Sequence, residues 1–184
     1  MKVIGTTLDD AAGEAFDKSA KILGLPYPGG PFIDKYSRKG NIHAFEFGKP
    51  KVKQLDFSFS GLKTSILRLI QKGIAEKPNF ITENLEDLCA SIQYSIVSIL
   101  LKKLEKAIIQ TGIKELAIAG GVAANSYLRS ELGELAKKKR YQLYIPKFEY
   151  CTDNAAMIAI AGYFKHLDKD FAQQSETPSA RLPF

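Results

Sequence analysis

The sequence predicts an α/β protein in which a mainly helical part precedes a small parallel α/β unit. Before residue 112, apolar residues recur three and four positions apart, a spacing typical of amphipathic helices. After it, two short apolar runs alternate with helical segments, an order typical of parallel strands joined by helices. The end of the chain is polar and has no such pattern. We therefore expect a helical part at 1–112, an α/β unit at 113–167 and a polar tail at 168–184.

The first helix is expected to begin in the segment Thr7–Asp10 and to run to about Leu23. That segment has the form of a capping box, a hydroxyl residue with a carboxylate three positions later. Gly24 ends the helix, and the segment Leu25–Pro31 is expected to form a rigid loop.

Three more helices are predicted before residue 112. A short one covers Ile33–Lys39, and the weak alternation of residues 41–59 allows a short strand or two after it. The second begins at Ser60. The third is long, from near Leu85 to near Gly112, because apolar residues line one face of it throughout.

The α/β unit is predicted from the order strand, helix, strand, helix. The strands are Lys114–Ala119 and Tyr141–Ile145, and the helices are Asn125–Arg140 and Asp153–Leu167. Two strands are few for a complete sheet, so this unit is expected to be part of something larger.

The composition is that of an ordinary globular protein, with 45% hydrophobic and 25% charged residues. The net charge of +6 favours polyanionic partners such as nucleic acid, although a solvated lysine-rich surface would give the same excess. No apolar run approaches the roughly 20 residues of a membrane span, and no secretory signal opens the sequence. The two cysteines form no disulfide framework, so we expect a reducing, cytoplasmic location and no membrane partner.

Three carboxylates, Asp10, Glu14 and Asp17, fall on one face of the first helix if each residue turns it by about 100°. The opposite face carries apolar and small residues: Ala12, Phe16, Ser19, Ala20 and Leu23. The acidic face could accept hydrogen bonds from sugar hydroxyls at a binding site. Alternatively, it is a solvated face whose acids complement the helix dipole.

The Gly120-Gly121 pair follows the first predicted strand and precedes a helix. Glycines there let backbone amides approach a ligand, and the helix N-terminus favours anions. A tight turn would explain the pair equally well, and Asn125 could bind a base or hydroxyl or cap its own helix. The third glycine of the dinucleotide fingerprint is missing, and the segment Gly61–Thr64 lacks the Walker A spacing.

Asp153 follows the second strand, at the edge where parallel sheets bind ligands. Its carboxylate could hold a metal ion, or it could be the N-cap of the last helix. The two histidines, His43 and His166, are isolated in the sequence, so neither is a credible metal ligand.

Five characteristic segments occur in order along nearly the whole chain: Gly5–Lys18, Tyr27–Pro31, Asp56–Thr64, Ala119–Asn125 and Cys151–Asn154. Together they resemble the family of tRNA threonylcarbamoyladenosine transferases, formerly labelled glycoproteases. The resemblance implies an actin/Hsp70-like ATPase fold, similar to ribonuclease H, of which this chain would be the C-terminal part with a largely helical insertion. It also implies transfer of a threonylcarbamoyl group from an adenylate to the exocyclic amine of the adenosine beside a tRNA anticodon.

The same resemblance implies site residues and partners. Asp17, Gly30, Asp34 and Asn125 would contact the nucleotide part of threonylcarbamoyl-adenylate. Asp153 would bind a metal ion, iron or zinc, that acts as a Lewis acid. The catalytic residues stay unknown. The implied partners are tRNA, the adenylate and the other proteins of the threonylcarbamoyladenosine-synthesis complex.

Members of this family also carry a metal-binding histidine pair and a Ser-Gly-Gly-His-Thr segment, and the sequence contains neither. We therefore expect a C-terminal part that is inactive alone and does not retain the metal, because affinity depends on the number of ligands. Two other functions stay open: a metalloendopeptidase, although the sequence has no HExxH motif, and a non-catalytic docking module. An apolar edge left by a missing lobe would favour self-association.

Overall fold

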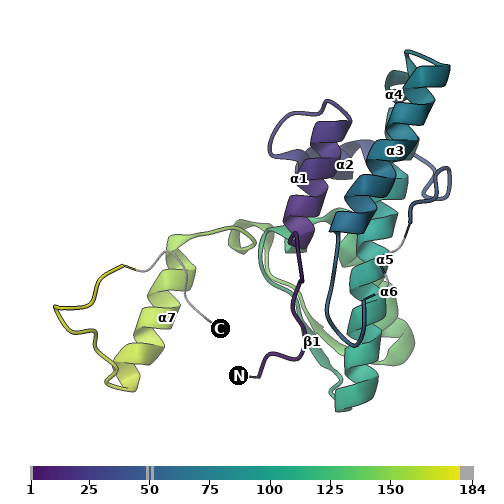
Figure 1. Ribbon diagram of the computed structural model, residues 1–184. Coiled ribbons are helices and arrows are strands. Elements are labelled where there is room, and N and C mark those ends of the chain that lie inside the picture. The colour runs from purple at the N-terminus through teal and green to yellow at the C-terminus, as the bar shows by residue number, and fades with distance from the viewer. Residues whose placement is uncertain (1, 49, 51, 179–184) are drawn as a thin grey trace.

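The computed structural model describes residues 2–48, 50 and 52–178 of the chain. Its elements, in order, are α1 (Ala12–Ile22), α2 (Gly29–Ser37), α3 (Ser60–Glu76), α4 (Phe80–Glu83), α5 (Leu85–Thr111), β1 (Glu115–Ala117), the 3-10 helix η1 (Gly121–Ala124), α6 (Ser126–Lys139), β2 (Gln142–Tyr144), the 3-10 helix η2 (Phe148–Tyr150) and α7 (Ala155–Leu167) (Figure 1). The chain is therefore mostly helical with a small parallel sheet, as the sequence predicts. Residues 179–184 of the predicted tail lie outside the described residues.

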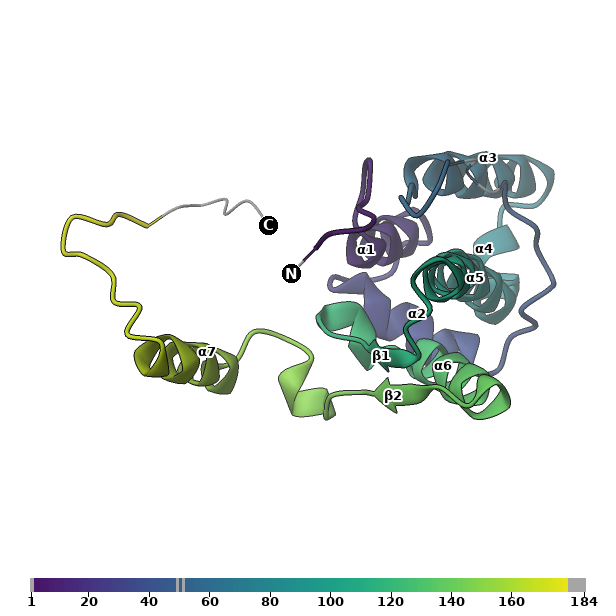
Figure 2. The same ribbon diagram turned by 90° about the horizontal axis from the view of Figure 1, so that it is seen from below.

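The core is built around α5, which Figure 2 shows end-on between the other helices of the body. The side chains of Leu88, Ile92 and Ile96 on α5 are completely buried. They pack in one cluster with buried residues of α1, α2, α3 and α6. Burial of each such side chain contributes about 1.5–3 kcal/mol to stability. This helix therefore holds α1, α2 and α6 in the positions that the site requires.

The predicted long helix and the predicted parallel strand pair are both confirmed. Gly112 ends α5 in the left-handed conformation, with a φ of 71° that glycine adopts without strain. β1 and β2 pair in parallel, with Leu116 opposite Leu143. Both strands are shorter than predicted, and α6 and α7 begin one and two residues later than predicted. Within the described residues, every helix is too short or too polar to cross a membrane.

The predicted start of the first helix is wrong. α1 begins at Ala12, and the Glu14 carboxylate accepts a hydrogen bond from the Ala11 amide at its first turn. The Thr7 hydroxyl instead donates to the Asp10 carbonyl at 2.8 Å, and Thr7 bridges Phe57 in parallel. A long-range pairing therefore uses the residue that local spacing assigned to the cap.

The helix predicted at Ile33–Lys39, which is α2, begins earlier than predicted, at Gly29 rather than Ile33. A Cβ on Gly29 would lie 2.2 Å from the Cβ of Ala20, so only glycine allows α1 and α2 to approach this closely. Pro31 is compatible with the first turn, where its missing N–H has no helical partner. The Gly29-Gly30 pair is thus the start of α2 and not a loop.

The strands allowed for in residues 41–59 do not form in the described part of that segment, which excludes residues 49 and 51. The segment is held against other elements by side chains. Lys103 of α5 donates to the carbonyls of Val52 at 3.0 Å and Gln54 at 2.8 Å. The Ser91 hydroxyl accepts from the Phe45 amide at 3.1 Å. Apart from the single bridge between Phe57 and Thr7, contacts with α5 take the place of strand pairing here.

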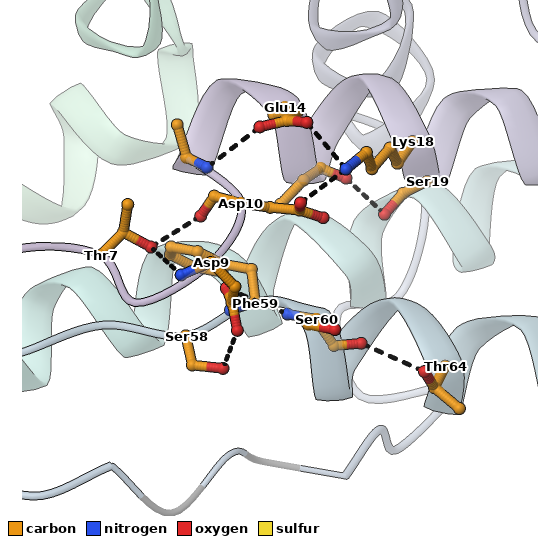
Figure 3. Close-up of polar contacts among 12 residues, drawn as sticks. Thr7, Asp9, Asp10, Glu14, Lys18, Ser19, Ser58, Phe59, Ser60 and Thr64 are labelled. Carbon is orange, nitrogen blue, oxygen red and sulfur yellow. Dashed lines mark hydrogen bonds and ion pairs between the residues drawn. The ribbon is translucent and has the colours of Figure 1, made fainter.

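Asp9 caps α3 from a segment fifty residues away (Figure 3). One carboxylate oxygen accepts from the amides of Phe59 at 2.7 Å and Ser60 at 3.3 Å, and the other accepts from the Ser58 hydroxyl. Burial acts to raise the pKa of Asp9, but these hydrogen bonds to the charged form outweigh it and lower that pKa below its ordinary value.

Replacing Asp9 by alanine is expected to lower the free energy of unfolding by about 0.5–2 kcal/mol, the usual effect of a lost helix cap. Because the pKa is lower in the folded state, this stabilisation is complete above the unfolded-state pKa and disappears as the pH falls through the folded-state pKa. Urea unfolding of wild type and Asp9→Ala at about pH 7 and about pH 2.5 measures both effects. Glu134→Ala, at an exposed carboxylate on α6, is the control. A difference that stays the same at both pH values would contradict the prediction.

Candidate functional site

Asp17 lies on α1 and reaches the N-terminus of α2. Its Oδ1 accepts from the amides of Gly29 at 2.7 Å and Gly30 at 3.3 Å, so the carboxylate caps α2 from outside that helix. These bonds orient the group, and a carboxylate has about four acceptor positions in all. The Oδ2 atom therefore remains available to accept hydrogen bonds from a ligand's hydroxyls.

Asp34 lies on α2 and fixes the start of α6. Its Oδ1 accepts from the Ser126 hydroxyl at 2.7 Å and the Ser126 amide at 3.1 Å, while Oδ2 pairs with Arg38 at 3.2 Å. The carboxylate is half-buried, whereas Arg38 is largely exposed. Asp34 thus joins two helices that are ninety-two residues apart in the sequence.

Asn125 caps α6, which confirms one of the two roles that the sequence left open. Its Oδ1 accepts from the Leu128 amide at 2.9 Å, and its Nδ2 donates to Gln93 Oε1 at 2.6 Å. Gln93, on α5, in turn donates to the Ser37 hydroxyl of α2 at 2.7 Å. Asn125 is 8% exposed, and one N–H of its amide is left over from these contacts.

Gln93 is a member of this network that sequence reasoning missed. The available signal was weak: an amide residue that directly follows Ile92, one of the apolar residues by which the long helix was predicted. Gln93 is 4% exposed, and a buried amide is stable only when it is hydrogen-bonded. Among the described residues, no buried side-chain polar atom lacks a partner.

The structure therefore brings together four of the five predicted site residues: Asp17, Gly30, Asp34 and Asn125. Hydrogen bonds connect them through the starts of α2 and α6 and through Gln93. Backbone N–H groups at helix N-termini favour negatively charged partners. The arrangement is a rigid polar surface on which carboxylate acceptors lie beside two helix N-termini.

Asp153 lies on a cleft of about 670 Å³ beyond the carboxyl ends of the two strands. Gly120 and Gly121 line the same cleft, and Gly120 has a φ of 83° that favours glycine. The alternative role of Asp153 as an N-cap is wrong, because the Asn154 side chain caps α7 by accepting from the Met157 amide at 3.0 Å. Asp153 therefore lines the cleft and does not cap α7.

The 3-10 helix η1 connects this cleft with the polar surface. Gly120 directly precedes η1, Gly121 is its first residue, and Asn125 directly follows it. The side chain of Val122, on η1, lies beside Gly13 of α1, where a Cβ would be 3.5 Å from it. A ligand that spans η1 could therefore meet both the Asp17 side and the Asp153 side.

The residues that the structure describes do not by themselves fit a metal ion. Of the described residues that line the cleft, Asp153 alone is acidic. Among the described residues, no three histidine, cysteine, aspartate or glutamate side chains are close enough to form a metal site. One oxygen donor holds a transition metal poorly, since structural and catalytic zinc sites have at least three protein ligands.

The acidic face predicted for the first helix is divided in the structure. Lys18 bridges Asp10 at 2.5 Å and Glu14 at 2.7 Å, and these contacts raise the pKa of Lys18 (Figure 3). Only Asp17 turns toward α2. The predicted opposite face is confirmed as the packed one, with Phe16 and Ala20 buried.

α7 is the helix that was predicted at Asp153–Leu167. It stands apart from the helical body in both views (Figures 1 and 2). It has no buried residue. Its large apolar side chains are exposed: Met157, Ile158, Ile160, Tyr163, Phe164 and Leu167. Met157 and Ile160 line the same cleft as Gly120.

Comparison with known proteins relates the whole chain to a single family. The family described as tRNA N6-adenosine threonylcarbamoyltransferase matches residues 1–160. A protein of that name from Christiangramia forsetii is 59% identical over 184 residues, which are 100% of this chain and 54% of its own length. Proteins of the same name from Riemerella anatipestifer and Cytophaga hutchinsonii are 56% and 50% identical, covering 98% and 99% of this chain and 53% of their own lengths. The chain thus spans about half the length of the curated relatives that it matches.

Proposed function

This chain belongs to the tRNA N6-adenosine threonylcarbamoyltransferase family, and on that premise we propose that it forms one side of the nucleotide site of such an enzyme. The reaction is transfer of a threonylcarbamoyl group from threonylcarbamoyl-adenylate to the exocyclic amine of the adenosine beside a tRNA anticodon. The observation that carries the proposal is the hydrogen-bonded set Asp17, Gly30, Asp34 and Asn125.

Asp17 is proposed to accept hydrogen bonds from the ribose hydroxyls of the adenylate. Its Oδ1 is held by the Gly29 and Gly30 amides, so Oδ2 is oriented before the ligand arrives. A hydrogen bond to a charged acceptor contributes about 1.5–3 kcal/mol. An added Cβ at Gly30 would lie 3.8 Å from the Cβ of Phe16, an ordinary van der Waals contact, so the proposed role of Gly30 rests on its amide, which orients Asp17.

Asp34 and Asn125 are proposed to contact the same nucleotide through the donor and acceptor positions that their hydrogen bonds within the chain do not use. Asn125 retains one N–H, which can donate to a ring nitrogen or a hydroxyl oxygen. Asp34 retains acceptor positions on Oδ2 beside Arg38. Because their internal bonds fix both side chains, the ligand orders few groups when it binds.

Asp153 is proposed to supply one oxygen ligand to the iron or zinc of the complete site, where the metal acts as a Lewis acid. The chain by itself is expected to hold no stoichiometric metal and to catalyse no transfer. The proposal includes an actin/Hsp70-like fold for the complete protein, a cytoplasmic location, and tRNA and the other proteins of the synthesis complex as partners.

A metalloendopeptidase is disfavoured because the family that the chain matches, and the relatives compared, are described as tRNA N6-adenosine threonylcarbamoyltransferases. A non-catalytic docking module, or self-association, is favoured by one observation, the exposed apolar side chains of α7. Nucleotide binding separates this second candidate from the first, because a pure docking module has no saturable nucleotide site.

Calorimetric titration of the chain with adenosine 5′-monophosphate is expected to show saturable binding at one site. Binding to tRNA should weaken steeply as salt rises, since Lys and Arg contacts to phosphates release counterions. Adenosine 5′-monophosphate titrated into heat-unfolded chain is the control. No saturable nucleotide binding, with tRNA affinity that does not respond to salt, would contradict the proposal.

A further inference from the structure

Arg129, on the first turn of α6, makes four contacts with segments that lie on either side of the cleft. Its Nε donates to the Ala123 carbonyl at 2.6 Å, and its Nη2 donates to the Pro146 carbonyl at 2.6 Å. Nη2 also donates to Cys151 Sγ at 3.3 Å. The guanidinium carbon lies 4.0 Å from the centre of the Phe148 ring, a cation–π distance.

These contacts tie the two walls of the cleft to one side chain. Ala123 belongs to η1, which begins at the cleft residue Gly121. Cys151 is 3% exposed, lines the opposite wall and lies two residues before Asp153. The paired part of the sheet ends where Ala117 lies opposite Tyr144. Beyond Tyr144, the segment that carries Cys151 depends on side chains for its position.

We propose that Arg129 is a positioning residue that holds Gly120 and Gly121 at a set distance from Asp153, so that both walls can meet one ligand. The inference rests on the proposed function for the identity of that ligand. A planar guanidinium suits the task, because it directs several N–H groups in fixed directions while it stacks on a ring. The ammonium of lysine offers a single charged centre that cannot reach both carbonyls, the sulfur and the ring together.

Cys151 provides a direct readout of this contact. It is held by Arg129, and the second cysteine, Cys89, is completely buried in α5 and serves as an internal reference. Burial also raises the pKa of Cys89 to about 12, which keeps that thiol protonated and slow to react. In Arg129→Gln, the reaction of Cys151 with a thiol reagent such as dithionitrobenzoate is expected to be at least about tenfold faster, with Cys89 unchanged.

Affinity for adenosine 5′-monophosphate is the second readout. If Arg129 only stabilised the fold in general, the loss of affinity would be accompanied by a faster thiol reaction at Cys89. Arg129→Gln is expected to weaken this affinity by about tenfold. Arg129→Lys should not restore it, and Arg68→Gln, at an exposed arginine on α3, should change neither readout. If Arg129→Gln fails to fold, Phe148→Ala tests the contact instead, since the ring is 63% exposed, and should raise Cys151 reactivity by about threefold.

Unchanged Cys151 reactivity in both variants would overturn the inference, as would equal gains at Cys151 and Cys89, which indicate global unfolding. A tenfold gain at Cys151 with unchanged nucleotide affinity would also overturn it. If the wild-type chain binds no nucleotide, the proposed function fails, while the thiol reaction still decides whether Arg129 holds the two walls.

Discussion

Asp17→Asn is expected to bind adenosine 5′-monophosphate about 10- to 100-fold more weakly than the wild-type chain, the effect of losing hydrogen bonds to a charged acceptor. The asparagine oxygen can still accept from the Gly29 and Gly30 amides, so the N-terminus of α2 stays capped. The second position becomes an NH₂ donor, which cannot accept a hydrogen bond from a ribose hydroxyl. Calorimetric titration of both proteins measures the difference.

Asp87→Asn is the matched control for this prediction. The Asp87 carboxylate also accepts from a backbone amide of a distant segment, that of Asn41 at 2.7 Å, but lies outside the candidate site. Its replacement should leave nucleotide affinity unchanged and alter thermal stability about as much as Asp17→Asn does. Equal losses of affinity in the two variants would show that Asp17 acts only through the fold.

Ile92→Ala is expected to lower the free energy of unfolding by about 2–5 kcal/mol, the range for truncation of a buried large aliphatic side chain. Ile92 is completely buried on α5, where α1, α2, α3 and α6 pack in one core cluster. The chain is small, and typical domains have only about 5–15 kcal/mol of stability, so much of the protein would be unfolded at moderate urea concentrations. Urea unfolding measured by circular dichroism quantifies the loss.

Ile109→Ala makes the same chemical change on the same helix, at a side chain that is 81% exposed. We expect it to change the free energy of unfolding by no more than about 0.5 kcal/mol, as is usual for surface positions. A similar loss in both variants would contradict the assignment of Ile92 to the core. It would instead point to a general effect of shortening side chains on α5.

The helices and strands that the sequence predicted well are those determined by local patterns. The long helix ends at Gly112 because a glycine in the left-handed conformation is the usual way to end a helix. The order of strand, helix, strand and helix predicted parallel strands correctly. Asp17, Gly30, Asp34 and Asn125 came from motif resemblance, and the structure places these four residues together.

The sequence by itself determined the α/β class, the main helices and the family. Apolar periodicity and the linked motifs depend on residues that are close together in the sequence. Only the tertiary structure decided which side chains cap which helices: Asp9 caps α3, Asp17 caps α2, and Asp34 fixes α6. It also decided that Arg129 joins both walls of the cleft. The physical reason is that the free N–H groups of a helix N-terminus can donate to any well-placed oxygen, whether it belongs to a neighbouring residue or to one far along the chain. Local spacing therefore cannot identify the partner, and packing around α5 selects it.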